Sequence, residues 1–186
     1  MIKNAAFTFI IFFLSFNKSY SSDLNKIINN IQQLNTVKFN FIQNINDKTE
    51  IGNCTLAFSG KLKCLYDDKN KKELVVNDNQ LAISQKRYNK TFFYPVKKSY
   101  FKEILNKQDF IKIISQSKKK VRDKQIHLKY KKNEINQITF LFDKNSFFLE
   151  GWKTTDQFNN KILFEIEILE SNFSVNDDFF KIPYIN

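Results

Sequence analysis

Apolar residues along this chain recur with two periods, and the first of them is helical. In the segment 24–35 they stand three or four positions apart, at Leu24, Ile27, Ile28, Ile31 and Leu34. That spacing places them on one stripe of a helix. Ser22 or Asp23 can accept hydrogen bonds from the first backbone N–H groups. We therefore predict a helix over residues 24–35 and, from similar spacing, two shorter helices around residues 100–105 and 109–115.

The second period is two residues, which is typical of β-strands, and it governs most of the remaining chain. Apolar and polar residues alternate in the segments 37–41, 126–130, 138–142 and 162–168. Clusters containing Asn and Asp separate such segments and are typical of turns. The pattern predicts about nine to eleven short strands joined by hairpins, since the connections are too short for the crossovers of a parallel sheet.

Because most of these strands have one apolar face, we expect a mainly β (α+β) fold built on one antiparallel sheet. Two or three short helices are too few to form a full second layer. A strongly curved sheet, or incomplete antiparallel β-barrel, would leave a hydrophobic cavity under a helical lid. A β-sandwich or a closed barrel filled by Phe side chains fits the pattern equally well.

The N-terminal segment has the organisation of a secretory signal. Lys3 precedes an apolar run at residues 5–16, and the small residues Ser19, Ser21 and Ser22 follow. This order is typical of a signal peptide, and the run is short of the roughly 20 residues that cross a bilayer. We predict a signal peptide over residues 1–21 and one exported domain over residues 22–186; an uncleaved anchor is the alternative.

Two cysteines lie in neighbouring strand-like segments joined at Ser59-Gly60. A hairpin centred on position 59 would set Cys54 opposite Cys64. Such a cross-strand pair has the short Cβ separation that a disulfide requires, and an exported compartment permits the bond. We predict a structural Cys54–Cys64 disulfide, with two buried free thiols as the alternative.

The formal net charge is +11, yet the kind of cation argues against nucleic-acid binding. Of the 30 cationic side chains only Arg87 and Arg122 are arginines, whereas proteins that read phosphates and bases favour the planar arginine fork. We expect no nucleic-acid partner. The charge is better explained by solubility, compositional bias and attraction to anionic membrane surfaces.

Residue types for catalysis or metal binding are scarce. One His, two Cys and three Gly leave too little for a zinc site, a His-dependent centre or a Gly-rich phosphate loop. His127 falls on the polar side of its predicted strand, and the adjacent Asp177 and Asp178 would point in opposite directions on a strand. We expect no metal, no cofactor and no enzymatic activity. A small exported hydrolase or adhesin, the alternative, would need a polar pocket with a perturbed acid or base.

The order of these landmarks resembles the LolA family, the periplasmic carriers of outer-membrane lipoproteins. The segment 39–43 (FNFIQ) resembles the family's F-x-F-x-Q opening, 59–63 (SGKLK) its P-G-[KR]-[FL]-[RK] hairpin, and 74–79 (LVVNDN) its L-I-V-S-D-G turn. Near the end, Trp152, Asn159-Asn160, Phe164, Asn172 and the F-F-x-x-P of 179–183 resemble the family's closing segment. The match covers nearly the whole expected mature chain in the correct order.

The resemblance implies a monomeric periplasmic chaperone whose cavity receives the acyl chains of lipoproteins. The cargo would come from an inner-membrane lipoprotein-releasing transporter and pass to an outer-membrane acceptor lipoprotein. A LolA-like protein for another lipid, or a lipoprotein sensor, is the alternative.

The resemblance and the apolar stripes together give candidate site residues. We expect the lipid-binding cavity wall to include Ile31, Phe39, Phe41, Leu62, Val76, Phe140, Trp152 and Phe164. Lys63 stands where the family has an arginine that contacts the lid, so we expect it to donate to backbone carbonyls of the lid helices. Cys54 and Cys64 lie outside the general family pattern.

Overall fold

The computed structural model describes residues 22–77, 80–96, 104–131, 137–155 and 159–183. The predicted signal peptide and most of the predicted helix around 100–105 lie outside these ranges, although Ile104 and Leu105 have helical backbone. No helix within the described ranges is long and apolar enough to cross a membrane.

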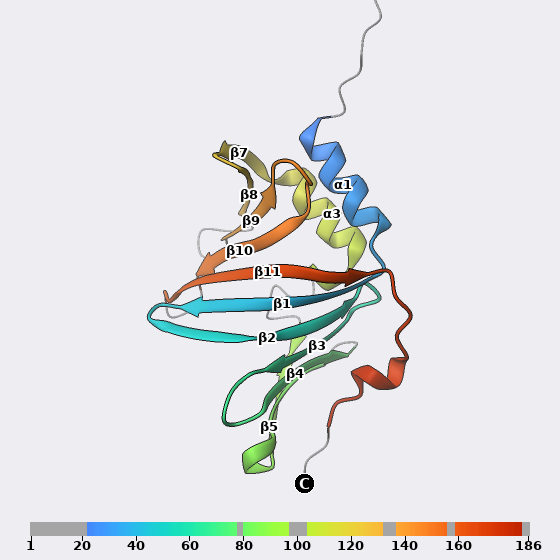
Figure 1. Ribbon diagram of the computed structural model, residues 1–186, viewed down its shortest axis with the longest axis vertical. Coiled ribbons are helices and arrows are strands. Elements are labelled where there is room, and N and C mark those ends of the chain that lie inside the picture. Colours follow the sequence, from blue (N-terminus) through green and yellow to red (C-terminus); the bar gives the residue numbers. More distant parts are fainter. Residues whose placement is uncertain (1–21, 78–79, 97–103, 132–136, 156–158, 184–186) are drawn as a thin grey trace, which may run out of the picture.

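Eleven strands in the described part of the chain form one antiparallel sheet (Figure 1). Its order is β6-β5-β4-β3-β2-β1-β11-β10-β9-β8-β7. The strands are β1 (Thr36–Ile45), β2 (Lys48–Ala57), β3 (Lys61–Tyr66), β4 (Lys72–Asn77), β5 (Gln80–Gln85), β6 (Lys90–Pro95), β7 (Lys118–Arg122), β8 (Gln125–Lys131), β9 (Gln137–Asp143), β10 (Leu149–Thr155) and β11 (Lys161–Ser171).

Two hairpin meanders account for this order. Strands β1 to β6 form the first and β7 to β11 the second, and pairing of β1 with β11 joins them. Neither β6 nor β7 has a second strand neighbour among the described residues, so the sheet curves without closing. The predicted incomplete barrel is therefore confirmed, and the sandwich and the closed barrel are not found. The exposed lysines at 118–120 on edge strand β7 discourage pairing with another sheet.

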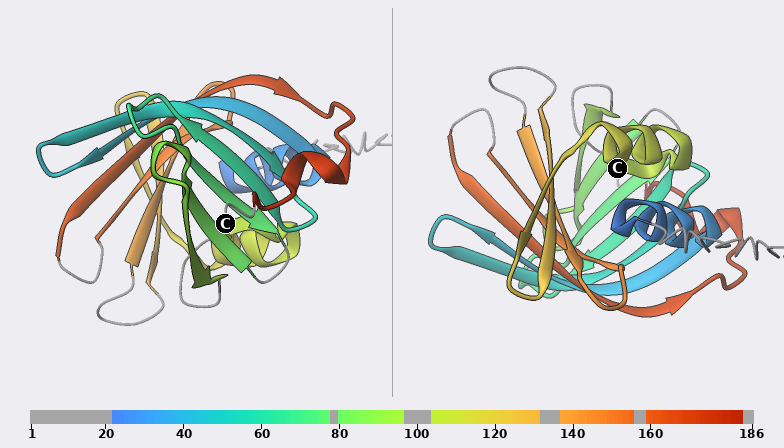
Figure 2. Two further views of the ribbon diagram at one scale, coloured as in Figure 1. Left: turned by 90° about the horizontal axis from the view of Figure 1, so that it is seen from below. Right: turned by 90° about the horizontal axis from the view of Figure 1, so that it is seen from above.

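Two α-helices lie inside the curve of the sheet, as Figure 2 shows. Helix α1 (Asp23–Gln33) begins where Ser22 Oγ accepts a hydrogen bond from Asn25 N. Helix α3 (Lys107–Gln116) begins where Asn106 Oδ1 accepts hydrogen bonds from the backbone N–H groups of Gln108 and Asp109. The helices predicted over 24–35 and 109–115 are thus confirmed with shifts of one or two residues at their ends. The short 3-10 helices are η1 (Lys86–Tyr88) and η3 (Asp177–Phe180).

Buried apolar residues of the inner sheet face gather in two clusters. The helix-side core joins both helices to strands β8 and β9; its members are Ile27, Ile31, Phe110, Ile113, Ile114, Ile126, Leu128, Ile138, Phe140 and Phe142. The disulfide-side core lies mainly on β1 to β5 and β11; its members are Val37, Phe39, Phe41, Cys54, Leu56, Leu62, Cys64, Leu74, Val76, Leu81, Val96, Leu105 and Phe164. Phe58 and Trp152 pack against both cores.

The C-terminal segment crosses the outer face of the first meander. Asn77 Nδ2 donates to Phe180 O (3.3 Å), and Thr91 Oγ1 donates to Pro183 O (3.2 Å). Lys61 forms an ion pair with Asp177 at 2.8 Å. The Phe180 side chain is fully buried. Strands β3 to β6 are therefore covered on their outer side by this segment, whereas the helices cover the inner side of β8 and β9.

Candidate functional site

An apolar cavity lies where the two cores meet, beneath helix α1. Its only polar lining residue among those described is Asn30. The cavity measures about 80 Å³, well below the roughly 300–1,000 Å³ of typical ligand pockets. The lining residues are Asn30, Ile31, Leu34, Val37, Phe39, Leu56, Phe58, Leu62, Ile104, Leu105, Phe110, Phe142, Phe147, Phe148, Leu149, Trp152, Ile166 and Ile168. The structure therefore holds the site in a closed form.

Strand alternation explains why so many elements contribute apolar atoms here. Phe39 on β1 pairs directly with Ile168 on β11 and with Cys54 on β2, so the three side chains share the inner face. Leu56 on β2 pairs in the same way with Leu62 on β3. The Ile31 side of helix α1 closes the site from above the sheet.

A row of stacked aromatic rings extends from the cavity across the inner face. Trp152 stacks on Phe164 at 4.3 Å between ring centroids, and Phe164 stacks on Phe41 at 5.0 Å. Phe41 meets Tyr66 edge to face at 5.0 Å. A Cβ atom on Gly52 would lie 2.8 Å from the Phe41 ring, so glycine at this position makes room for the row. Burial raises the pKa of the Tyr66 phenol.

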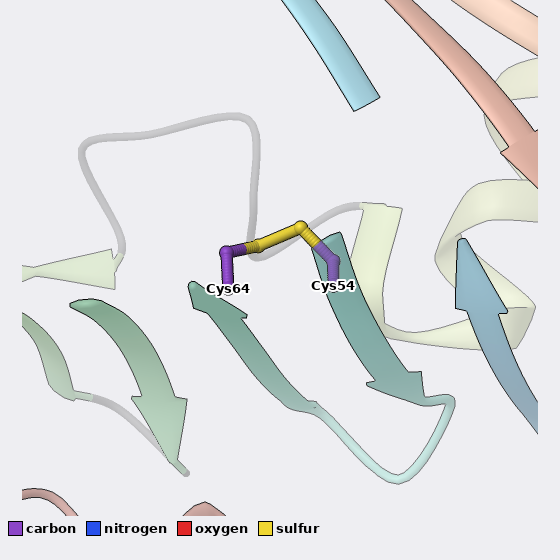
Figure 3. The surroundings of a disulfide bond; sticks show 2 residues. All are labelled: Cys54 and Cys64. Atoms are coloured by element: carbon purple, nitrogen blue, oxygen red, sulfur yellow. A yellow bond between two sulfur atoms is a disulfide. The ribbon is translucent and has the colours of Figure 1, made fainter. Parts of the chain in front are cut away.

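The predicted disulfide is confirmed and belongs to the wall beside the cavity. Cys54 and Cys64 are directly paired across β2 and β3, with Cα atoms 4.1 Å apart, and their sulfurs are bonded (Figure 3). Both are buried in the disulfide-side core. The covalent bond fixes the relative position of two strands that supply Leu56 and Leu62 to the cavity.

Helix α1 is tethered at both ends by polar contacts that the sequence pattern did not reveal. Asn30 Nδ2 donates to Ser146 O at 3.0 Å, and the Lys26 ammonium lies 4.6 Å from the centre of the Phe147 ring. Lys107 Nζ, on α3, donates to Gln32 O (3.2 Å) and to Asn35 Oδ1 (2.9 Å). These contacts join residues far apart in sequence and follow no local motif.

The eight residues predicted for the wall divide into two groups. Ile31, Phe39, Leu62 and Trp152 line the cavity. The other four lie in the packed interior around it: Phe41 and Phe164 in the aromatic row, Val76 in the disulfide-side core, and Phe140 against Phe110 in the helix-side core at 5.2 Å between ring centroids. Alternation gives the face of a strand correctly but not how completely other elements cover each position.

Lys63 lies on the opposite side of the sheet from the cavity. Its neighbours Leu62 and Cys64 face inward, so Lys63 faces outward. Its Nζ donates to Phe179 O at 3.2 Å and lies 4.9 Å from the centre of the Phe179 ring. The expected contact with the lid helices is therefore replaced by a contact with the C-terminal segment.

A buried carboxylate supports this contact. Glu73 is 2% exposed and lies 3.0 Å from Lys63 Nζ and 2.6 Å from Lys86 Nζ. Burial by itself would raise the pKa of Glu73, but the two lysines outweigh it and hold that pKa below its ordinary value. This charged group is structural, because it lies on the outer face and away from the cavity.

The described residues hold no group of three or more His, Cys, Asp or Glu side chains that could bind a metal ion. His127 hydrogen-bonds to Gln125 at 3.3 Å. Burial, together with Lys153, Arg122 and Lys120, lowers the pKa of His127. What the cavity lining offers to a ligand is apolar surface against which apolar groups can be buried.

Comparison with known protein sequences points in the same direction. Residues 32–183 match the family described as "Outer membrane lipoprotein carrier protein LolA". The chain is 27% identical over 181 residues to an outer-membrane lipoprotein carrier protein of Campylobacter jejuni, covering 94% of this chain and 92% of the relative.

Solved structures share the fold at low sequence identity. An uncharacterized conserved protein from Thermus thermophilus superposes with a TM-score of 0.54 at 7% identity, over 87% of this chain and 92% of that one. A DUF1329 family protein from Desulfovibrio piger gives a TM-score of 0.50 at 7% identity, over 88% and 98% of the two chains. The curved sheet with internal helices is thus found in other proteins.

Proposed function

Because this chain belongs to the LolA family of outer-membrane lipoprotein carriers, we propose that it binds the acyl chains of lipoproteins in the apolar cavity between its two cores. The observation that carries the proposal is the lining of that cavity, in which Asn30 is the one polar residue among those described. Exposing a C16 acyl chain to water costs about 12 kcal/mol at about 0.8 kcal/mol per methylene. A protein that covers such a chain needs apolar surface, and it needs no nucleophile or metal.

Binding requires the site to open, because about 80 Å³ is far too small for an acyl chain. We infer that helices α1 and α3 stay packed on β8 and β9 and separate from β1, β2, β3 and β11. The helix-side core supports this direction, since it buries Ile27 and Ile114 fully. The acyl chain would then compete with the closing contact between Lys107 on α3 and Asn35, the residue before β1, which keeps its affinity low enough for release.

The cellular role that we propose is transport of lipoproteins across the periplasm. Residues 1–21 would direct export and be removed, leaving a single carrier domain over residues 22–186. An inner-membrane lipoprotein-releasing transporter would load the carrier, and an outer-membrane acceptor lipoprotein would unload it. We assign no catalytic step to the protein.

Adjacent residues of β11 provide a matched test. Ile168 lines the cavity, whereas Leu169, which the β1 pairing skips at a bulge, is not among its lining residues and is 50% exposed. We expect Ile168→Glu to weaken binding of a fluorescent fatty-acyl probe by at least about tenfold, since a carboxylate would be buried against the chain. Leu169→Glu should leave binding within about twofold, because that position stays in water. Equal affinities for the two variants, or no binding by the wild type, would reject the proposed site.

A further inference from the structure

Five cations share the outer face of the second meander. Lys118 pairs with Lys129, Lys129 with Thr139, and Thr139 with Lys153, so these side chains point to the same side of the sheet. The alternation along β7 places Lys120 and Arg122 on that side too. We call this set the basic face: Lys118, Lys120, Arg122, Lys129 and Lys153.

The basic face is open to solvent; one carboxylate, Glu150, lies beside it, where it accepts a hydrogen bond from Gln125, the residue paired with Arg122. All five side chains are exposed, and none of them forms an ion pair with any carboxylate that the structure describes. The inner side of the same strands buries Ile126 and Leu128 against the helices, so the basic face points away from them. His127, among these cations, has a lowered pKa and is uncharged at neutral pH; Asp123 is the nearby carboxylate that opposes this shift.

An acidic strip lies beside the basic face, on β11. Glu165 and Glu167 on β11 are exposed and directly oppose Ile42 and Asn40 on β1. The outer surface of the second meander therefore has a basic part on β7 to β10 and an acidic strip along β11. A negatively charged partner would approach the basic part and be repelled by the acidic strip.

The cavity reaches the surface at one end of the basic face. The β9–β10 turn carries Phe148, which lines the cavity and is 43% exposed. Lys144, in that turn, donates its backbone N–H to Lys124 O at 2.8 Å, which joins the turn to the β7–β8 turn. Both lysines are exposed. An exposed aromatic ring flanked by lysines is typical of a surface that meets a membrane–water interface.

We propose that the basic face docks on an anionic phospholipid surface, with Phe148 and the cavity rim toward the bilayer. Four of its five cations are lysines spread over strands β7, β8 and β10, which suits a diffuse layer of lipid head groups better than a shaped polyanion. Each cation held near such a surface is expected to contribute about fivefold in affinity. Docking requires no acyl chain in the cavity, so a failure of vesicle binding and a failure of acyl-chain binding can be told apart.

The test is sedimentation of the purified protein with vesicles of phosphatidylglycerol and phosphatidylcholine, against vesicles of phosphatidylcholine alone. The test variant is Lys118→Glu/Lys120→Glu/Lys129→Glu. The matched control, with the same change in net charge, is Lys69→Glu/Lys71→Glu/Lys90→Glu, at exposed lysines far from β7 and β8 in the sheet. Binding of the fatty-acyl probe by both variants checks folding and the cavity independently.

We expect the wild type to bind only the anionic vesicles, the test variant to lose at least about tenfold, and the control to stay within about twofold. Binding should also fall steeply between about 50 mM and about 500 mM NaCl. Equal loss in the two variants, equal binding to neutral vesicles, or retention on heparin without vesicle binding would overturn the proposal. If the test variant does not fold, the corresponding triple Gln variant and the salt dependence of the wild type decide in the same way.

Discussion

The helix-side core and the disulfide-side core differ in how completely their residues are covered. Ile114, Leu128 and Phe140 in the helix-side core are fully buried. In the disulfide-side core, Leu56 and Phe164 keep 9% of their surface exposed, and the cavity lies beside them. The helices therefore fill one half of the curved sheet and only border the other.

The two halves also differ in what holds them together. The helix-side core is stabilised by dense packing of two helices on β8 and β9. The other half has the Cys54–Cys64 bond on its inner side and the C-terminal segment on its outer side. The difference shows that a sheet can hold the wall of a cavity in place without filling the space above it. Here the Cys54–Cys64 disulfide and the C-terminal segment stabilise strands that helices α1 and α3 only border.

Deleting the same atoms from each core gives the largest expected effect. Leu128→Ala should lower the free energy of unfolding by about 3–5 kcal/mol, because a fully packed site cannot collapse around the new void. Leu56→Ala should cost about 2–3 kcal/mol, since this side chain already borders a cavity. Urea unfolding monitored by circular dichroism measures both. Equal losses would show that the two cores are packed alike.

Removing the disulfide tests what holds the disulfide side. Cys54→Ala/Cys64→Ala should cost about 2–3 kcal/mol, the value expected for a closed loop of this length. Reduction of the wild type before urea unfolding should give a similar loss. A double variant as stable as the wild type would mean that strand pairing alone holds the wall.

The contact of the C-terminal segment with Lys63 should be sensitive to acid, because Glu73 holds Lys63 in place. The folded-state pKa of Glu73 lies below its ordinary value of 4.5, so its stabilising effect is complete above that value and is lost as pH falls through the folded pKa. Glu73→Gln should cost about 1–2 kcal/mol at neutral pH, because Lys63 loses a buried partner while the half-exposed Lys86 regains water. Urea unfolding at several pH values measures this difference, which should shrink below pH 4.5. A constant difference would exclude Glu73 as the acid-sensitive group.

The smallest effect is expected at the contact between the two helices. Lys107→Met removes one hydrogen bond to Gln32 O in α1 and one to Asn35 Oδ1 before β1, and should cost less than about 1 kcal/mol. It should also speed fatty-acyl probe binding in stopped-flow fluorescence, because the bond to Asn35 joins α3 to the residue before β1 in the closed form. Lys112→Met, at an exposed position of the same helix, is the control. Identical rates for the two variants would exclude this tether from the opening step.

Local patterns predicted the elements and their faces but not the tertiary contacts. Residues 24–34 and the symmetric placement of Cys54 and Cys64 were sufficient for a helix and a disulfide, because both depend on spacing within one or two elements. Phe140 was predicted for the cavity wall, yet it is covered by Phe110 of helix α3, which lies about 30 residues earlier in the chain. Alternation puts Phe140 on the inner face but says nothing about what lies above it.

The position of Lys63 shows the same limit from the other face. Its outward direction follows from Leu62 and Cys64 facing inward, but its partners come from β4 and from the C-terminal segment. Likewise, the contacts of α1 with Ser146 and Lys107 join residues that no motif connects. Their detection requires the arrangement of elements in space.

When an acyl chain enters, the helices should stay with β8 and β9 and separate from the strands of the disulfide-side core. Spin labels at the exposed positions Asn29 on α1 and Asn53 on β2 report on the opening side, and labels at Asn29 and Lys129 on β8 report on the fixed side. Pulsed electron paramagnetic resonance measures both distances with and without a diacylated lipopeptide. We expect the 29–53 distance to lengthen on binding while the 29–129 distance stays unchanged. Bound lipopeptide with both distances unchanged, or lengthening of the 29–129 distance alone, would contradict it.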